Sequence, residues 1–186
     1  MIFERNLAGH PKLSPISFGL LFLALFLYLI SLAAPYWAFG ITDKNVQVSI
    51  GVWMYCLTNI TQIECHYIGQ FHLLTDVQKG LLLGLQVLVI VVLVLMMGAA
   101  HMLGRKITQN YQGISLTTSI TLSGTAVLLL LVATTAYAGN FHHVQSFVPG
   151  AQLDFAYGLS IGVMVVCVVA EVFMIKEHVS VRVTPT

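Results

Sequence analysis

Four long apolar stretches dominate the chain, and each is about as long as a lipid bilayer is thick. They cover residues 15–34, 80–103, 116–138 and 155–175. About 20 helical residues, at ~1.5 Å each, cross a hydrocarbon core of ~30 Å. The stretches lack the polar alternation of a membrane β-barrel strand, and a helix satisfies its backbone hydrogen bonds internally. The pattern therefore predicts four transmembrane helices.

The first apolar stretch has a second interpretation, as a cleaved signal peptide. Arg5 and Lys12 precede it, and Ala33-Ala34 follow its apolar core. The apolar region of a signal peptide has about 7–15 residues. This stretch is longer, which favours a retained transmembrane helix.

The segment between the first two stretches, residues 35–79, carries a strand pattern. Apolar and polar residues alternate over 46–50, and β-prone runs follow at 52–58 and 60–68. A small sheet needs an apolar partner, which the ends of the helices supply. The predicted fold class is an all-α membrane protein, a four-helix transmembrane bundle with a small antiparallel β-sheet at one end.

Composition agrees with a membrane protein. The chain is 58% hydrophobic and 8% charged, with a formal net charge of +1. A soluble domain has about 25% charged residues, and a disordered chain needs low hydrophobicity with high charge. A nucleic-acid partner is not expected because there is no surplus of basic residues to neutralise phosphates. The lipid bilayer is the first expected partner.

The basic residues near the ends of the spans predict the orientation. Lys44 and Lys79 lie on the side of the predicted sheet. Six basic residues lie on the other side: Arg5, Lys12, Arg105, Lys106, Lys176 and Arg182. Cytoplasmic loops carry the excess of Lys and Arg.

This orientation places both termini in the cytoplasm of a multi-pass plasma-membrane protein and makes the sheet extracellular. The cytoplasmic segments are residues 1–14, 104–115 and 176–186. The outer segments are residues 35–79 and 139–154.

Two cysteines, Cys56 and Cys65, lie in the first outer segment, where oxidising conditions favour disulfides. Closing so short a loop stabilises the fold by roughly 2.5–3 kcal/mol. The alternative is a zinc site with the nearby histidines His66, His72 and His142-His143, but their spacing matches no zinc motif. The sequence favours a disulfide and predicts no metal and no cofactor.

A possible glycosylation site lies between the two cysteines. Asn59-Ile60-Thr61 has the acceptor pattern for N-glycosylation, on the side predicted to be extracellular.

No catalytic motif is present, so the sequence does not predict an enzyme. Glu171 is expected to reach the interface or to pair with Lys176 rather than to serve transport. A channel working alone would need a polar path, for which Gln86, His101, Glu171 and the hydroxyls of the third helix are the available residues. Two small-residue pairs allow helices to approach closely: Gly80 with Gly84, and Gly158 with Gly162. Packing inside the bundle is expected, and an interface between copies is the alternative.

The outer segment also resembles a known family. Trp37, the triplet Gly51-Val52-Trp53, Cys56 and Cys65 are similar to the claudin superfamily signature: a Trp, a Gly-Leu-Trp and two cysteines in the first extracellular loop. That superfamily includes claudins, peripheral myelin and epithelial membrane proteins, and regulatory subunits of calcium channels and AMPA receptors.

Three further segments extend the resemblance to most of the chain: Thr75–Lys79, Phe147-Val148-Pro149 and Phe155–Gly158. Val52 stands where the family usually has Leu. The stretch from Trp37 to Gly51 is shorter than in typical tight-junction claudins, and the acceptor site at Asn59 resembles the myelin and epithelial membrane branch.

The resemblance implies a structural protein of cell–cell contacts. Such a protein binds itself or related claudin-like proteins side by side in one membrane (in cis) and across the intercellular space (in trans), forming a paracellular barrier or pore. The alternative that it implies is an auxiliary subunit of an ion channel or receptor.

The resemblance also assigns roles to single residues. It implies that Trp37 and Trp53 pack where the sheet meets the bundle. It makes Phe147-Val148-Pro149 the tip for contact in trans. Three charged residues are then expected to influence which ions approach a paracellular path: Asp43, Lys44 and Glu64.

Overall fold

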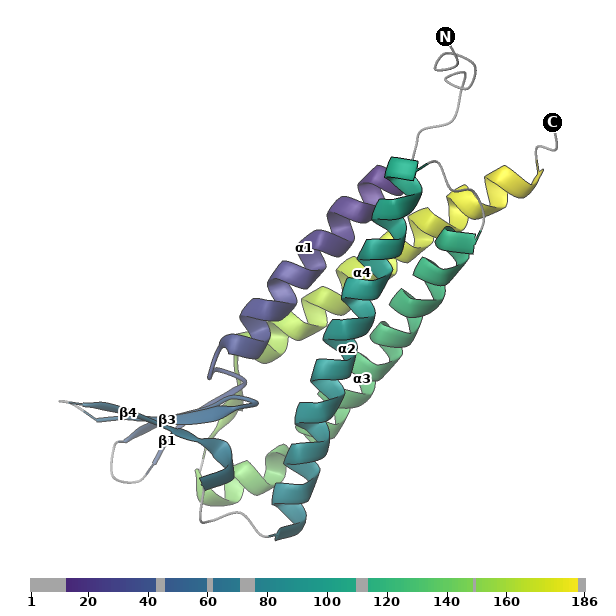
Figure 1. Ribbon diagram of the computed structural model, residues 1–186. Helices are drawn as coiled ribbons and strands as arrows, with labels where there is room; N and C mark the ends of the chain where they lie inside the picture. The colour runs from purple at the N-terminus through teal and green to yellow at the C-terminus, as the bar shows by residue number, and fades with distance from the viewer. Residues whose placement is uncertain are drawn as a thin grey trace.

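A bundle of four helices carries a small sheet at one end (Figure 1). The computed structural model describes residues 13–42, 46–59, 62–70, 76–109, 114–148 and 150–183. The helices are α1 (Leu13–Ala33), α2 (Asp76–Gln109), α3 (Ile114–Phe147) and α4 (Phe155–Val183). Each contains a stretch long and apolar enough to cross a membrane. The predicted fold class is confirmed.

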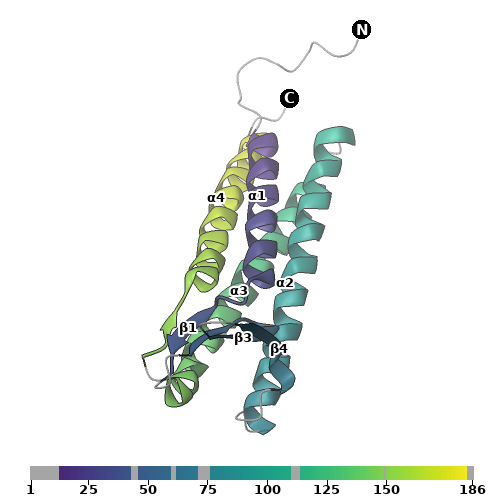
Figure 2. The same cartoon turned by 90° about the vertical axis from the view of Figure 1, so that its left-hand side faces the viewer.

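The start of α1 and the end of α4 lie away from the sheet. Figures 1 and 2 show the start of α1 and the end of α4 together, at the end of the bundle opposite the sheet. We call these two ends of the bundle the sheet end and the tail end.

The helices continue past the spans that the apolar pattern predicts. Residues 139–147, part of the predicted second outer loop, extend α3 as helix, and Asn140 Nδ2 donates a hydrogen bond to the Ala136 carbonyl (2.8 Å). The helix ends before Val148, which precedes Pro149 in the sequence, because a residue before proline avoids the helical conformation. Gly150 follows with a φ of 78°, which glycine adopts readily.

Inside the bundle, α1 packs chiefly on α4, and α2 on α3 (Figure 2). Polar side chains bridge the helices where no water is available. Tyr28 Oη donates to the Val89 carbonyl (3.0 Å), and Ser119 Oγ donates to the Ala99 carbonyl (2.8 Å). The fully buried Tyr28 also makes α1 part of the core.

The sheet has five described strands, in the antiparallel order β4-β3-β2-β1-β5. Their bounds are β1 (Ala38–Ile41), β2 (Gln47–Ile50), β3 (Met54–Thr58), β4 (Ile63–Tyr67) and β5 (Gln152–Leu153). A short 3-10 helix (Ile68–Gln70) follows β4. The three predicted strand runs correspond to β2, β3 and β4. The strands β1 and β5 have no clear sequence pattern because one is four residues long with a glycine and the other has two residues.

The paired glycines of α2 and α4 point away from the rest of the bundle. An added Cβ would meet no atom within 4 Å at any of them, namely Gly80, Gly84, Gly158 and Gly162. Larger side chains such as Val89 of α2 and Val163 of α4 fill the core instead. The expectation that these glycines pack helices inside the bundle is therefore wrong.

The ionic contact at the tail end differs from the one expected. Within the described chain, Glu171 forms no ion pair with Lys176. Residues five apart on a helix lie about 140° apart around its axis, whereas side chains three or four apart are neighbours. An ion pair joins Lys106 of α2 to Glu177 of α4 instead, with 15% and 18% of the side chains exposed.

Ser14 of α1 completes this group, which we call the tail-end cluster (Ser14, Lys106 and Glu177). Ser14 Oγ donates to Glu177 Oε2 (2.7 Å) and accepts from Lys106 Nζ (2.9 Å). The cluster therefore links three helices at the tail end.

Candidate contact surface and its anchor in the bundle

Trp37 is the residue around which the sheet joins the bundle. Its side chain is fully buried, and its ring packs edge-on against Tyr137 of α3 (centroids 5.0 Å apart) and Tyr157 of α4 (6.1 Å). Its Nε1 donates to the Ser31 carbonyl at the end of α1 (2.8 Å). One indole therefore contacts three helices, and its polar edge has the partner that a buried Trp needs.

The backbone around Trp37 is held on both sides. Its N–H donates to the Ile50 carbonyl, and its own carbonyl accepts from Asp154 N–H. The Ile50 carbonyl also accepts a longer bond from Tyr137 Oη (3.4 Å). These acceptors are main-chain groups, so they fix the path of the chain rather than one side-chain rotamer.

Gly51 is needed because another part of the backbone passes directly over it. A Cβ at this position would lie 2.8 Å from Pro35 Cα and 2.9 Å from the Ala34 oxygen. Both atoms belong to the main chain and cannot rotate away. The glycine of the signature is thus explained by a close approach between the end of α1 and the connection from β2 to β3.

The next two signature residues join this connection to α2. Val52 is fully buried, and its carbonyl accepts a hydrogen bond from Gln86 Nε2 (2.9 Å). Gln86 Oε1 in turn accepts from Tyr67 Oη (3.3 Å). Trp53 is half-buried against the core, and its carbonyl accepts from Ile68 N–H. We call Trp37, Gly51, Val52, Gln86 and Tyr137 the sheet anchor.

Cys56 and Cys65 form a disulfide. The register explains why, since the two residues lie directly opposite each other on β3 and β4. The predicted disulfide is confirmed. Because it engages both sulfur atoms, neither is available as a thiolate ligand for zinc.

A model of the PMP-22/EMP/MP20/Claudin family matches residues 13–175. The chain belongs to this family. A search of curated proteins gave no match. The matched region runs from the start of α1 into α4, so it contains the sheet anchor and the disulfide. The predicted superfamily is confirmed, and with it a multi-pass membrane protein.

In this family member, the β3–β4 part of the sheet projects to the side of the bundle (Figure 1). Every residue of β4 is exposed. In the described sheet, the outer edge of β4 pairs with no other strand. An open edge with exposed apolar residues is typical of a surface that binds another chain.

Four exposed apolar residues lie on one face of this sheet. Tyr67 lies opposite Met54, and the register places Ile63 and Ile41 on the same face. Their exposed fractions are 51%, 38%, 71% and 48%, in the order Tyr67, Met54, Ile63 and Ile41. We call these four residues, together with the outer edge of β4, the contact surface.

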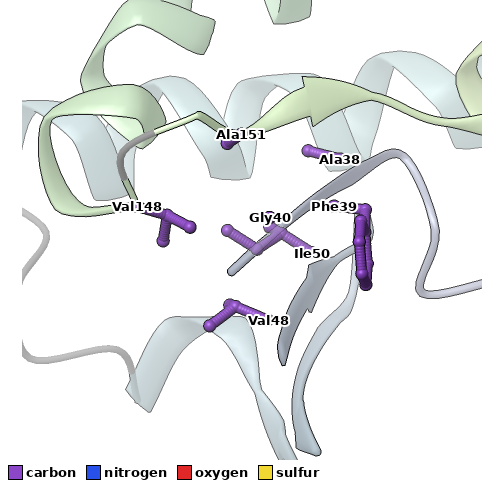
Figure 3. Close-up of a pocket in the computed structure, with 7 residues that line it drawn as sticks. All are labelled: Ala38, Phe39, Gly40, Val48, Ile50, Val148 and Ala151. Atoms are coloured by element: carbon purple, nitrogen blue, oxygen red, sulfur yellow. The ribbon is translucent and has the colours of Figure 1, made fainter. Parts of the chain in front are cut away.

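Val148 has a different role from the one predicted. It is buried (4% exposed) and lines a shallow apolar hollow that has no room for a water molecule. Figure 3 shows Val148 and Ala151 facing the residues of β1 and β2. A Cβ on Gly40 would lie 2.6 Å from Val148 Cγ1 and 2.9 Å from Ala151 Cα. Val148 therefore packs against β1 and β2 of the sheet, and its assignment to an exposed tip is wrong.

The other residues assigned to contacts or ion paths have varied positions. Phe147 is the last residue of α3, and Pro149 lies outside the described residues, as do Asp43 and Lys44. Glu64 is exposed on β4, with His66 Nε2 3.9 Å from its carboxylate.

The acceptor asparagine lies on the surface. Asn59 is exposed just after β3, and its N–H donates to the Gln62 carbonyl. The other two residues of the acceptor pattern, Ile60 and Thr61, lie outside the described residues.

The partners of Trp37 were not predicted from the sequence. Tyr137 and Tyr157 lie close to the ends of predicted spans, where aromatic residues are enriched, and this position could have indicated their contact with Trp37. Nothing in the sequence pattern indicated the role of Ser31. It accepts from Trp37 through its carbonyl and donates its hydroxyl to the Ala156 carbonyl (2.7 Å).

Proposed function

We propose that this chain is a claudin-like structural protein of the plasma membrane that makes cell–cell contacts. In this proposal it binds itself or related claudin-like proteins, both side by side in one membrane and across the intercellular space. The observation that carries the proposal is the contact surface, an open strand edge with exposed apolar residues on a sheet fixed to the bundle by buried contacts.

The proposed orientation has the sheet end outside the cell and the tail end in the cytoplasm. Two observations support it. The disulfide lies in the sheet, and disulfides persist in the oxidising extracellular space. Arg105, Lys106 and Lys176 lie toward the tail end of α2 and α4, in agreement with the excess of basic residues in cytoplasmic segments.

Contact across the intercellular space is assigned to the contact surface and to the segment after α3. The edge of β4 offers unpaired backbone groups for the addition of a strand, and Ile63 and Tyr67 offer apolar area. Phe147 and Pro149 remain the proposed tip. Glu64, Asp43 and Lys44 are proposed to influence which ions pass along a paracellular path.

The direct test is expression in epithelial cells that lack junctional strands. Enrichment at cell–cell contacts and a changed transepithelial resistance are the expected results. Diffuse surface staining with unchanged resistance contradicts the proposal.

A matched pair of variants on β4 separates contact from folding. Ile63→Lys puts a charge on the contact surface and is expected to abolish enrichment. His66→Lys changes an exposed residue on the opposite face of the same strand and is expected to retain it. Equal behaviour of the two variants would argue against this surface.

The second candidate, an auxiliary subunit of a channel or receptor, is favoured by one observation. Gly158 and Gly162 of α4 face away from the bundle with open space around them, which suits the close approach of another transmembrane helix. Co-purification with one channel in a fixed stoichiometry, without enrichment at contacts, would favour this candidate.

The orientation has its own test at Asn59. If the sheet is extracellular and the site is used, treatment with an N-glycosidase shifts the wild type on a gel but does not shift Asn59→Gln. A further test applies a membrane-impermeant amine reagent to intact cells. Labelling of Lys176 under these conditions would contradict the proposed cytoplasmic side.

A further inference from the structure

Two ionisable side chains lie inside the spans at a similar depth. His101 belongs to α2 and Glu171 to α4, and both helices run from the sheet end to the tail end (Figure 1). His101 lies seven residues before Thr108, where its span ends, and Glu171 lies nine residues before Ser180, where its span ends. At ~1.5 Å per residue, their depths differ by about 3 Å.

The carboxyl group of Glu171 is incompletely satisfied. It lies against α3, where a Cβ on Gly124 would be 3.7 Å from Oε1 and 3.9 Å from Oε2. The hydroxyl of Ser123 faces it, but within the described residues neither Ser123 Oγ nor Glu171 Oε1 completes a hydrogen bond of normal geometry. The residue as a whole is half-buried, so part of it is open to the outside. A carboxyl group in this position needs a hydrogen-bond donor.

His101 is a hydrogen-bond donor that needs an acceptor. It is exposed on the outer face of α2, on which Val94 (56% exposed) and Met97 (48%) also lie. No described residue forms a hydrogen bond, an ion pair or a ring contact with it. An imidazole carries at least one N–H donor in either protonation state. It is therefore a polar donor that faces an apolar environment.

The two residues do not meet within one chain. The outer face of α2 and the seam between α3 and α4 belong to different sides of the bundle, since α3 lies between α2 and α4 and packs on both. We propose that His101 of one copy donates a hydrogen bond to the Glu171 carboxyl of a neighbouring copy in the same membrane. The occupant of the α3–α4 seam is thus the α2 helix of a second copy.

This inference deepens the proposed function, on which it rests, by assigning its side-by-side contact to two surfaces. Because those surfaces differ, the contact is heterologous: each copy in a pair retains one unused surface, the Glu171 surface on one copy and the His101 surface on the other. Repetition builds a row or a ring, whereas a two-fold dimer would use the same surface twice.

The test is cysteine cross-linking of the full-length protein in membranes. A Cys167→Ala background removes the buried free thiol. One tagged copy then carries His101→Cys and a second, differently tagged copy carries Glu171→Cys. Oxidation is expected to join the two tags. The matched control replaces His101→Cys by Val87→Cys. Val87 lies on the same outer face of α2 but fourteen residues, or about 21 Å, nearer the sheet end, and its variant is expected to give no cross-link.

A second measurement examines the hydrogen bond itself. Glu171→Gln keeps the size of the side chain and is expected to weaken self-association in membranes by roughly three- to tenfold, the range for one polar contact between helices. The exchange of His101→Glu and Glu171→His in one chain is expected to restore association. Arrival at the cell surface and an intact Cys56–Cys65 disulfide verify the folding of each variant.

Several results would overturn the inference. The first is a cross-link between two copies of the same variant that is as strong as, or stronger than, the one between His101→Cys and Glu171→Cys. The second is capture of a different protein in place of a second copy. The third is unchanged self-association of Glu171→Gln. The outcome is separable from the proposed function. Enrichment at contacts without the 101–171 cross-link overturns only this inference, and the cross-link without enrichment overturns only the contact function.

Discussion

At the sheet end, the side chains of Trp37 and Gln86 donate hydrogen bonds to backbone carbonyls, whereas at the tail end a side-chain ion pair joins α2 to α4. The sheet anchor is neutral and buried. The tail-end cluster is charged, and about a sixth of the surface of each of its two ionic side chains is exposed.

This difference determines which substitutions each end of the bundle tolerates. Backbone acceptors have fixed positions, so the sheet anchor determines how the sheet is oriented on the bundle. A mostly buried ion pair is less specific, because replacing both partners with apolar residues is often neutral, although removing one partner leaves an unpaired charge. The sheet end is therefore expected to tolerate little change, and the tail end is expected to tolerate paired changes.

Trp37→Ala is expected to have the largest effect. Truncation of a fully buried Trp costs about 3–5 kcal/mol, here with the loss of the hydrogen bond to Ser31. The variant is expected to be retained inside the cell and to show a lower melting temperature in detergent. Trp37→Phe keeps the aromatic packing and is expected to lose less. Normal stability of Trp37→Ala would show that the sheet anchor does not stabilise the protein.

The next largest effect is expected from breaking the tail-end cluster on one side. Glu177→Ala leaves Lys106 without its partner and is expected to cost about 2–3 kcal/mol, below the 3–5 of a fully buried pair because these side chains are partly exposed. Thermal unfolding of the purified protein measures this loss. The double variant Lys106→Met with Glu177→Leu is expected to recover most of it. If the double variant is as unstable as Glu177→Ala, the two ends do not differ as described.

Gly40→Ala tests the close approach beneath the sheet. The added methyl group would meet Val148 Cγ1 at 2.6 Å, and overpacking of this kind costs about 1–2 kcal/mol. Combination with Val148→Ala makes room and is expected to reduce the loss. Gly158→Ala is the matched control, because nothing lies within 4 Å of its new methyl group. Equal destabilisation by the two glycine variants would contradict the described packing.

The smallest effect is expected from Tyr137→Phe. Its hydrogen bond to the Ile50 carbonyl is long, at 3.4 Å, so its loss is expected to cost about 0.5 kcal/mol, the low end for one hydrogen bond. Tyr28→Phe removes a shorter bond of 3.0 Å and is expected to cost more. The order of the two melting temperatures decides this point.

Much of the fold could be predicted because it follows from simple patterns. Span length gives the helices, and the outward position of Cys56 and Cys65 is sufficient to predict their disulfide. The directions of Gly158 and Gly162 could not be predicted in the same way. Lipid and the bundle core are both apolar, so an almost wholly apolar helix gives little sign of which face points inward.

The tertiary contacts of the candidate site were also beyond the sequence pattern. Val148 is followed by proline, which is typical of a loop, and its burial follows from its packing against β1 and β2, with Gly40 as a close neighbour. Glu171 has a lysine five residues away in the sequence, but helical geometry turns the two apart. Trp37 was placed correctly from the family resemblance, while its acceptor at Ser31 depends on how α1 ends.

The central claim is that the anchored sheet carries the contact surface between cells. A mixed culture of expressing and non-expressing cells tests it most directly, through the enrichment of the protein at each kind of border. Enrichment is expected only at borders where both cells express the protein, with loss for Ile63→Lys and retention for His66→Lys. Equal enrichment at borders with non-expressing cells would contradict it.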